Sequence, residues 1–125
     1  MIYAVGTDLV EISRIEKIIE TWGERFVRKV YSEGEIRYCS TKAYPAQHFA
    51  ARFAAKEAFL KGVGLGMAGG VGFRDVEVIN RAEGKPELNF HGRAREMVDE
   101  AAITKCHISL SHTDRYAVAF IVLEK

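Results

Sequence analysis

Two charged residues, Glu57 and Lys61, lie four positions apart within residues 45–64, the strongest helix-forming stretch of the chain. This spacing places the two side chains next to each other on one helix face. On a helical wheel Glu57 falls between Phe53 and Leu60, inside an apolar stripe. A carboxylate on an apolar face is costly unless a cation or a metal ion balances it. The spacing alone leaves two interpretations open, an ordinary ion pair at the edge of a core helix and a pair that acts on a ligand.

A second isolated carboxylate, Asp8, follows the apolar run of residues 2–5, which predicts a buried strand that ends at Gly6. Mg²⁺ binds one or two protein carboxylates, and water and substrate phosphate oxygens complete its coordination. Asp8 and Glu57 would suit such an ion if the fold brings them together. An equal alternative for Asp8 is the N-cap of the first helix.

The residues Ser111, His112 and Thr113 stand at the predicted end of a strand and offer hydroxyl and imidazole groups. Adjacent strand residues point to opposite faces, so Ser111 and His112 do not form a nucleophile–base pair, and the chain contains no GxSxG motif. We interpret these groups as hydrogen-bond donors to phosphate oxygens. For Ser109 and His107, on the same predicted strand, ordinary hydrogen bonding at a strand end remains the alternative.

Several basic residues could add phosphate contacts, although each taken singly is more often a solvated surface charge. They are Arg52, Lys56, Lys61 and Lys85. Lys85 lies in the sequence Gly84-Lys85-Pro86, which is first of all a hairpin turn. The glycine-rich residues 62–72 match neither the GxGxxG nor the GxxxxGK[ST] nucleotide-binding motif.

The elements that position these side chains follow from hydrophobic periodicity and capping signals. Ser13 with Glu16, and Ser32 with Glu35, each fit a capping box at the start of a helix. The predicted elements are a strand at 2–5, helices at 13–22, 33–39 and 45–62, hairpin strands at 76–79 and 87–90, a helix at 92–102, and strands at 106–112 and 116–123. This order predicts one α+β domain over residues 1–125, with a mainly antiparallel sheet packed against one long helix and several short ones.

Composition argues against nucleic-acid-binding, secreted and membrane-spanning proteins. The chain has 125 residues, 48% of them hydrophobic, and a net charge of +1, so general electrostatic binding to nucleic acid is not expected. Its two cysteines, Cys39 and Cys106, have no metal-ligand spacing, and the first residues resemble neither a signal peptide nor a membrane span, so we expect free thiols in a reducing cytoplasm. Residues 116–123 are apolar throughout, which requires burial on both faces and predicts an oligomer.

Four segments together resemble the holo-acyl-carrier-protein synthase family, the small bacterial 4′-phosphopantetheinyl transferases. The segments are GTDLVEI (6–12), RFAAKEAFLKGVG (52–64), GKPEL (84–88) and ISLSHTDRYAVAFIV (108–122). The family moves the phosphopantetheine arm of coenzyme A onto a serine of an apo carrier protein, in fatty acid biosynthesis, and releases 3′,5′-ADP. The resemblance implies the family fold, a compact homotrimer with sites between subunits, and no nucleophile of the chain's own.

The resemblance also implies roles for individual residues. Asp8 and Glu57 would bind Mg²⁺, Glu57 or a water on the metal would take the serine proton, and Lys61 would neutralise the leaving group. The residues that would contact coenzyme A are Arg52, Lys85, Pro86, Ser111, His112 and Thr113. The acidic face of the carrier protein would meet a basic surface formed by Arg14, Arg25 and Phe26.

Two other functions fit part of the sequence. A silent module that binds coenzyme A or a nucleotide and regulates a partner would use Arg52, Lys85 and His112, but it gives no reason for Glu57 on an apolar stripe. A structural oligomerisation domain would explain residues 116–123 alone. Neither function accounts for all of the motifs.

Overall fold

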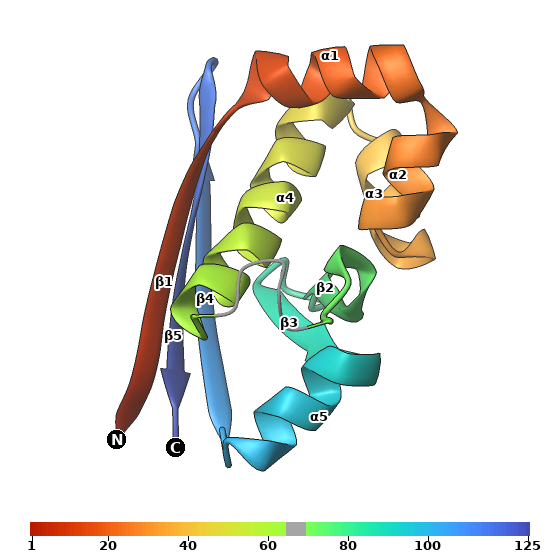
Figure 1. Cartoon of the computed structure of the whole chain (residues 1–125). Helices are drawn as coiled ribbons and strands as arrows, with labels where there is room; N and C mark the ends of the chain where they lie inside the picture. The colour runs from red at the N-terminus through yellow and green to blue at the C-terminus, as the bar shows by residue number, and fades with distance from the viewer. Residues whose placement is uncertain (65–69) are drawn as a thin grey trace.

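The structure is a computed structural model that describes residues 1–64 and 70–125 (Figure 1). The elements are β1 (Ile2–Glu11), α1 (Ile12–Trp22), α2 (Glu24–Val30), α3 (Glu33–Ser40), α4 (Pro45–Gly62), the 3-10 turn η1 (Phe73–Asp75), β2 (Val76–Asn80), β3 (Pro86–Phe90), α5 (Gly92–Glu100), β4 (Lys105–His112) and β5 (Tyr116–Glu124). Helix α2 has no counterpart among the predicted elements. The centre of the predicted glycine-rich segment lies outside the described residues.

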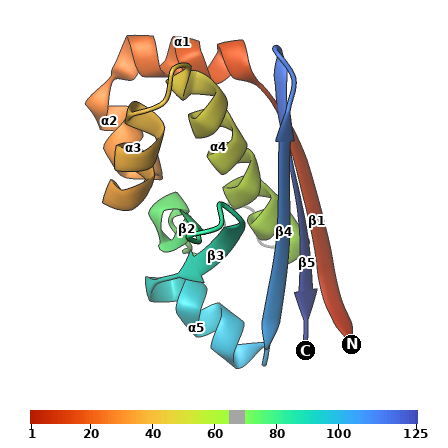
Figure 2. The same ribbon diagram turned by 180° about the vertical axis from the view of Figure 1, so that it is seen from behind.

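The strands form two antiparallel sheets, a three-stranded sheet in the order β1-β5-β4 and the hairpin β2-β3. Helix α4 lies across one face of the larger sheet, and the other helices and the hairpin lie on the same side (Figures 1 and 2). The predicted α+β fold is confirmed, with the strands divided between two sheets.

Helix α4 is the centre of the molecule. It begins at Pro45 and ends at Gly62, as predicted, because proline suits the first turn of a helix. Its side chains from Phe49 to Leu60 are buried with the exception of Glu57. The helix is therefore surrounded by the core on almost all sides, and Glu57 is the side chain in this stretch that reaches the surface.

The predicted end of the first strand at Gly6 is wrong, since β1 continues to Glu11. Gly6 faces α4, where an added Cβ atom would lie 1.9 Å from the carbonyl oxygen of Ala58. The glycine therefore allows strand and helix to pack closely and does not interrupt the strand. As a consequence Asp8 lies inside β1, opposite Ala119 of β5.

The two predicted capping boxes have different outcomes. Helix α1 follows β1 directly at Ile12, Glu11 occupies the N-cap position without a side-chain cap, and Ser13 Oγ donates to Glu11 Oε1 at 2.8 Å. The Ser13–Glu16 box and the N-cap role of Asp8 are therefore both wrong. The box of Ser32 and Glu35 at the start of α3 is confirmed.

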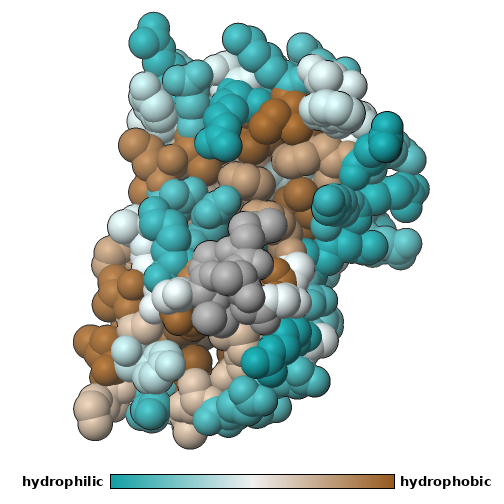
Figure 3. Space-filling view, in the orientation of Figure 1, coloured by the Kyte–Doolittle hydropathy of each residue, from teal (hydrophilic) through white to brown (hydrophobic). Residues whose placement is uncertain are grey.

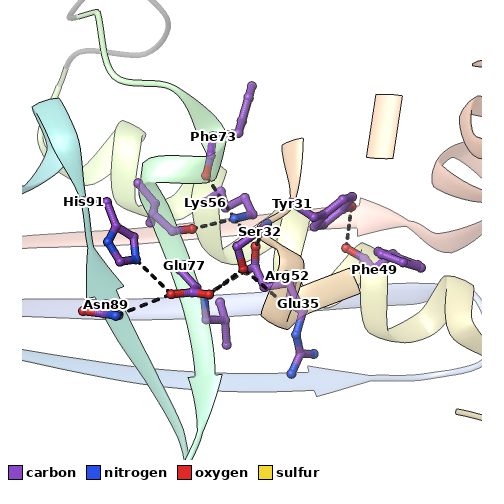
Figure 4. A network of polar contacts seen from close by, with 12 residues as sticks. Tyr31, Ser32, Glu35, Phe49, Arg52, Lys56, Phe73, Glu77, Asn89 and His91 are labelled. Carbon is purple, nitrogen blue, oxygen red and sulfur yellow. Dashed lines mark hydrogen bonds and ion pairs between the residues drawn. The ribbon is translucent and has the colours of Figure 1, made fainter. Parts of the chain in front are cut away.

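Lys56 of α4 is fully buried and forms an ion pair with Glu35 at 2.8 Å (Figure 4). Its Nζ atom also donates to the carbonyl oxygens of Phe73 and Val76, at 3.0 and 2.6 Å, so all three protons of the ammonium group are used. Glu35 accepts a further bond from the backbone amide of Val78. Neither alternative predicted for Lys56, a phosphate contact or a solvated charge, is correct; it joins α4 to α3, η1 and β2.

In the part of the chain that the structure describes, no element covers the outer face of the three-stranded sheet. Its exposed apolar side chains include Tyr3, Val5, Leu9, Tyr116 and Phe120. Apolar side chains lie along the side of the molecule that β1 forms in Figure 1 (Figure 3). Strand β5 is thus buried by α4 on one face only.

Within the described residues, no helix has the length and apolar character that a membrane crossing needs.

Candidate functional site

Asp8, Glu57 and Lys61 lie together where β1 passes the C-terminal half of α4. Lys61 Nζ donates to Asp8 Oδ1 at 3.2 Å. The side chain of Lys61 is 54% exposed and that of Asp8 is 18% exposed, so this pair is open to solvent. The close packing at Gly6 holds β1 against α4 and fixes this arrangement.

The surroundings of Glu57 favour its protonated form. Partial burial raises the pKa of Glu57, and the charge of Asp8 raises it further. Lys61 and Arg14 act in the opposite direction. A carboxylate whose ionisation is disfavoured by burial and by a neighbouring acid forms part of a site that a cation would stabilise.

The donor set fits a hard divalent cation that has few protein ligands. Among the described residues no three His, Cys, Asp or Glu side chains come close enough together to hold a metal ion by themselves. Asp8 and Glu57 would supply two carboxylates, and Mg²⁺ commonly takes its other ligands from water and substrate phosphate. The group therefore suits a metal that binds together with a phosphate-containing substrate.

Four of the residues predicted to bind coenzyme A line one cleft of about 190 Å³ between α4, the hairpin turn and the end of β4. They are Arg52, Pro86, Ser111 and His112. Lys85 lines the adjoining groove with Pro86 and Cys106. Thr113 belongs to the β4–β5 turn, where its hydroxyl accepts bonds from two backbone amides. The structure thus brings four of the six together and leaves Lys85 and Thr113 beside them.

Arg52 is 2% exposed and has no carboxylate partner among the residues described here. Its guanidinium donates to Asn80 Oδ1 at 2.6 Å and lies over the ring of Tyr38. Its Nε atom has no hydrogen-bond partner within the described residues. A buried cation without an acidic partner is unfavourable by itself, which indicates that an anion binds nearby.

Among the cleft residues that were not predicted from the sequence, three contact Arg52: Asn80, Tyr38 and His48. Asn80 joins Arg52 to the hairpin turn, because its Nδ2 atom also donates to the carbonyl oxygen of Gly84. Tyr38 and His48 also line the cleft. The sequence carried one usable signal, the spacing of four that places His48 next to Arg52 on the same face of a helix.

The two groups of residues lie at opposite edges of the larger sheet. Asp8 belongs to β1 and His112 to β4, and β5 separates these strands. The lining of the cleft includes none of Asp8, Glu57 and Lys61. Within one chain the two groups therefore lie apart, one on β1 and the other at the end of β4.

The surface predicted for a protein partner lies on α1 and α2. Arg25 and Phe26 line a groove of about 460 Å³ together with Trp22, which is exposed, and Lys29. Arg14 lies on the exposed side of α1 and its charge reaches Glu57. The basic surface thus begins beside the carboxylate pair.

Comparison with known proteins gives one family. The model of the 4′-phosphopantetheinyl transferase superfamily matches residues 4–121. The holo-[acyl-carrier-protein] synthase of Syntrophus aciditrophicus is 48% identical over 124 residues, which cover 99% of this chain and 97% of that protein. The crystal structure of the Neisseria meningitidis holo-[acyl-carrier-protein] synthase matches with a TM-score of 0.92 at 35% identity over the whole of both chains. The Helicobacter pylori synthase, solved in complex with coenzyme A, matches with a TM-score of 0.85 at 28% identity over 96% of this chain and 99% of that chain.

Proposed function

This chain belongs to the 4′-phosphopantetheinyl transferase superfamily and is a phosphopantetheinyl transferase, and on that premise we propose that it modifies a serine of an apo acyl carrier protein with the phosphopantetheine of coenzyme A. The observation that carries the proposal is the group of Asp8, Glu57 and Lys61, two carboxylates and a cation at a solvent-accessible position. The partner's serine supplies the nucleophile.

The residues divide the work of phosphoryl transfer. The serine oxygen forms a bond to the phosphorus that carries pantetheine, and the bond from that phosphorus to the bridging oxygen breaks, which releases 3′,5′-ADP. Glu57 takes the serine proton, and its raised pKa suits a general base. Lys61, on the same helix face and half-exposed, neutralises the charge that develops on the leaving phosphate.

Asp8 and Glu57 would hold Mg²⁺ together with the diphosphate of the donor. The ion would supply charge neutralisation for the phosphate oxygens. The pKa of Glu57, which burial raises and the charge of Asp8 raises further, supports this assignment.

We also propose that the working form is a homotrimer whose sites lie between subunits. The carboxylate group and the Arg52 cleft occupy opposite edges of one sheet. Contact between two copies would place the carboxylate group of one chain next to the Arg52 cleft of its neighbour. The uncovered apolar face with Leu9 and Phe120 supplies a surface for that contact. Coenzyme A would then bind across two subunits, with its phosphates at Arg52, Ser111 and His112, and with Lys85, Pro86 and Thr113 beside them.

The acyl carrier protein would bind on the surface of Arg14, Arg25 and Phe26. Exposed basic side chains next to the apolar Trp22 suit an acidic partner with an apolar contact point. The position of Arg14 near Glu57 would direct the partner's serine towards the reacting groups.

Intact-mass analysis of an apo acyl carrier protein after incubation with enzyme, coenzyme A and Mg²⁺ tests the function. We expect the carrier to gain one phosphopantetheine, and we expect Asp8→Asn or Glu57→Gln to lower the rate by about a thousandfold, since each removes part of the charge stabilisation of the transition state. Circular dichroism would verify that both variants fold. Binding of coenzyme A without Mg²⁺ dependence and without product would instead favour the silent binding module.

A further inference from the structure

His48 is a titratable side chain of the Arg52 cleft that the proposed function does not use. Its ring lies 5.8 Å from the ring of Tyr38 and 6.3 Å from the ring of His112, in both cases edge to face. Its backbone carbonyl accepts a bond from Arg52. The side chain thus stands between the buried guanidinium and the end of β4.

The described surroundings of His48 are positively charged or neutral. Two cationic groups lie over the Tyr38 ring, with Arg52 Cζ 4.2 Å and Lys42 Nζ 4.3 Å from its centre. Among the described residues that line the cleft there is no Asp or Glu. Its volume of about 190 Å³ is below the range for a whole drug-sized ligand, which suits one charged group of a larger molecule.

We propose that His48 binds a phosphate monoester in this cleft, the 3′-phosphate of coenzyme A, and takes up a proton as that phosphate binds. The assignment of the ligand rests on the proposed function, whereas the preference for a doubly charged phosphate rests on the cleft itself. Arg52 supplies a fixed positive charge, and His48 adds a second one only when the anion is present.

The direction of proton transfer follows from the groups that face the imidazole. Burial lowers the pKa of His48, and the charges of Arg52, Lys42 and His112 lower it further, so the ring is neutral at neutral pH without ligand. The facing groups come from α3 (Tyr38), the segment after it (Lys42), α4 (Arg52) and β4 (His112). A phosphate dianion reverses this balance and favours the imidazolium, which can donate a charge-assisted hydrogen bond.

Isothermal titration calorimetry with coenzyme A at pH 7.5, in two buffers that differ in ionisation enthalpy, measures the proton uptake. At this pH the phosphate is already mostly dianionic because its second pKa is about 6. We expect the wild type to take up a large fraction of one proton. His48→Gln should lose this uptake and bind about tenfold more weakly, and His48→Phe, which retains an aromatic ring against Tyr38, should do the same.

Two controls isolate the group. His91→Gln changes a histidine on the far side of the hairpin, paired with Glu77, and should leave both affinity and proton uptake unchanged. Dephospho-coenzyme A, which lacks the 3′-phosphate, should show no uptake that depends on His48.

Equal uptake by wild type and both His48 variants would overturn the proposal, and so would an equal His48-dependent uptake with dephospho-coenzyme A. Either result is compatible with an active transferase in the mass assay. Loss of the mass shift in the wild type, with binding and proton uptake intact, would instead reject the proposed function alone.

Discussion

Helix α4 carries two acid–lysine pairs that differ in their exposure to water. Lys56 and Glu35 are both fully buried, 2.8 Å apart, and every proton of the ammonium group has an acceptor. Lys61 and Asp8 lie 3.2 Å apart at the surface, where Lys61 is half-exposed.

The difference teaches which pair can take part in chemistry. Lys56 cannot leave its three acceptors without a large loss of free energy, because a buried charge must stay paired. Lys61 loses little if it leaves Asp8 for a phosphate, because surface ion pairs contribute only about 0–1 kcal/mol. The Lys56–Glu35 pair therefore holds α4 in place, while Lys61 is free to exchange Asp8 for a phosphate.

Lys56→Met tests the fixed pair and should produce the largest effect on stability. The substitution leaves the buried carboxyl group of Glu35 without its cation, so we expect the free energy of unfolding to fall by about 3 kcal/mol or more. Urea denaturation monitored by circular dichroism measures this change. Lys61→Met is the matched control, the same substitution on the same helix, and should cost less than about 0.5 kcal/mol; equal losses for the two variants would contradict the comparison.

Lys61→Met tests the exchangeable pair and should act on the rate. We expect kcat for carrier modification to fall by about tenfold to a hundredfold, because a cation near the leaving phosphate is lost, with a smaller change in KM for coenzyme A. Steady-state assays of the mass shift measure both constants. Lys61→Arg retains the charge and should recover part of the rate, whereas an unchanged kcat in Lys61→Met would exclude the role.

The contrast between the pairs also explains which features could be predicted from the sequence. Pro45 and Gly62 delimit α4 by local rules, and the Ser32–Glu35 capping box depends on residues three apart, so both predictions are confirmed. The burial of Lys56 depends on Glu35, 21 positions away, and on backbone carbonyls of η1 and β2. Helical spacing does not reveal such distant partners.

The same limit applies to the site. Glu57 and Lys61 could be paired from the sequence because they are neighbours on one helix. The approach of Asp8 to Lys61 depends on the close packing of Gly6 against Ala58. In the sequence, the same glycine suggests the end of a strand. Motif resemblance identified four of the cleft residues, Arg52, Pro86, Ser111 and His112. It did not identify His48. Helical spacing relates His48 to Arg52 alone, whereas its contacts with Tyr38 of α3 and His112 of β4 depend on the fold.

Glu57→Gln tests the carboxylate next to the exchangeable pair and should give the smallest effect on stability, a gain in the free energy of unfolding. Because the pKa of Glu57 is raised in the folded chain, ionised Glu57 destabilises the fold at neutral pH, and this penalty disappears as the pH falls below the unfolded value of about 4.3. Without metal we expect the variant to gain about half a kcal/mol at pH 7, the usual size for partly exposed charges, and nothing at pH 3.5. Urea denaturation in the presence of a chelator measures the difference at each pH. Since Asp8 is one cause of the raised pKa, the gain should shrink in an Asp8→Asn background; a gain that is the same in both backgrounds would mean that the two carboxylates do not interact, and the case for a shared cation would be lost with it.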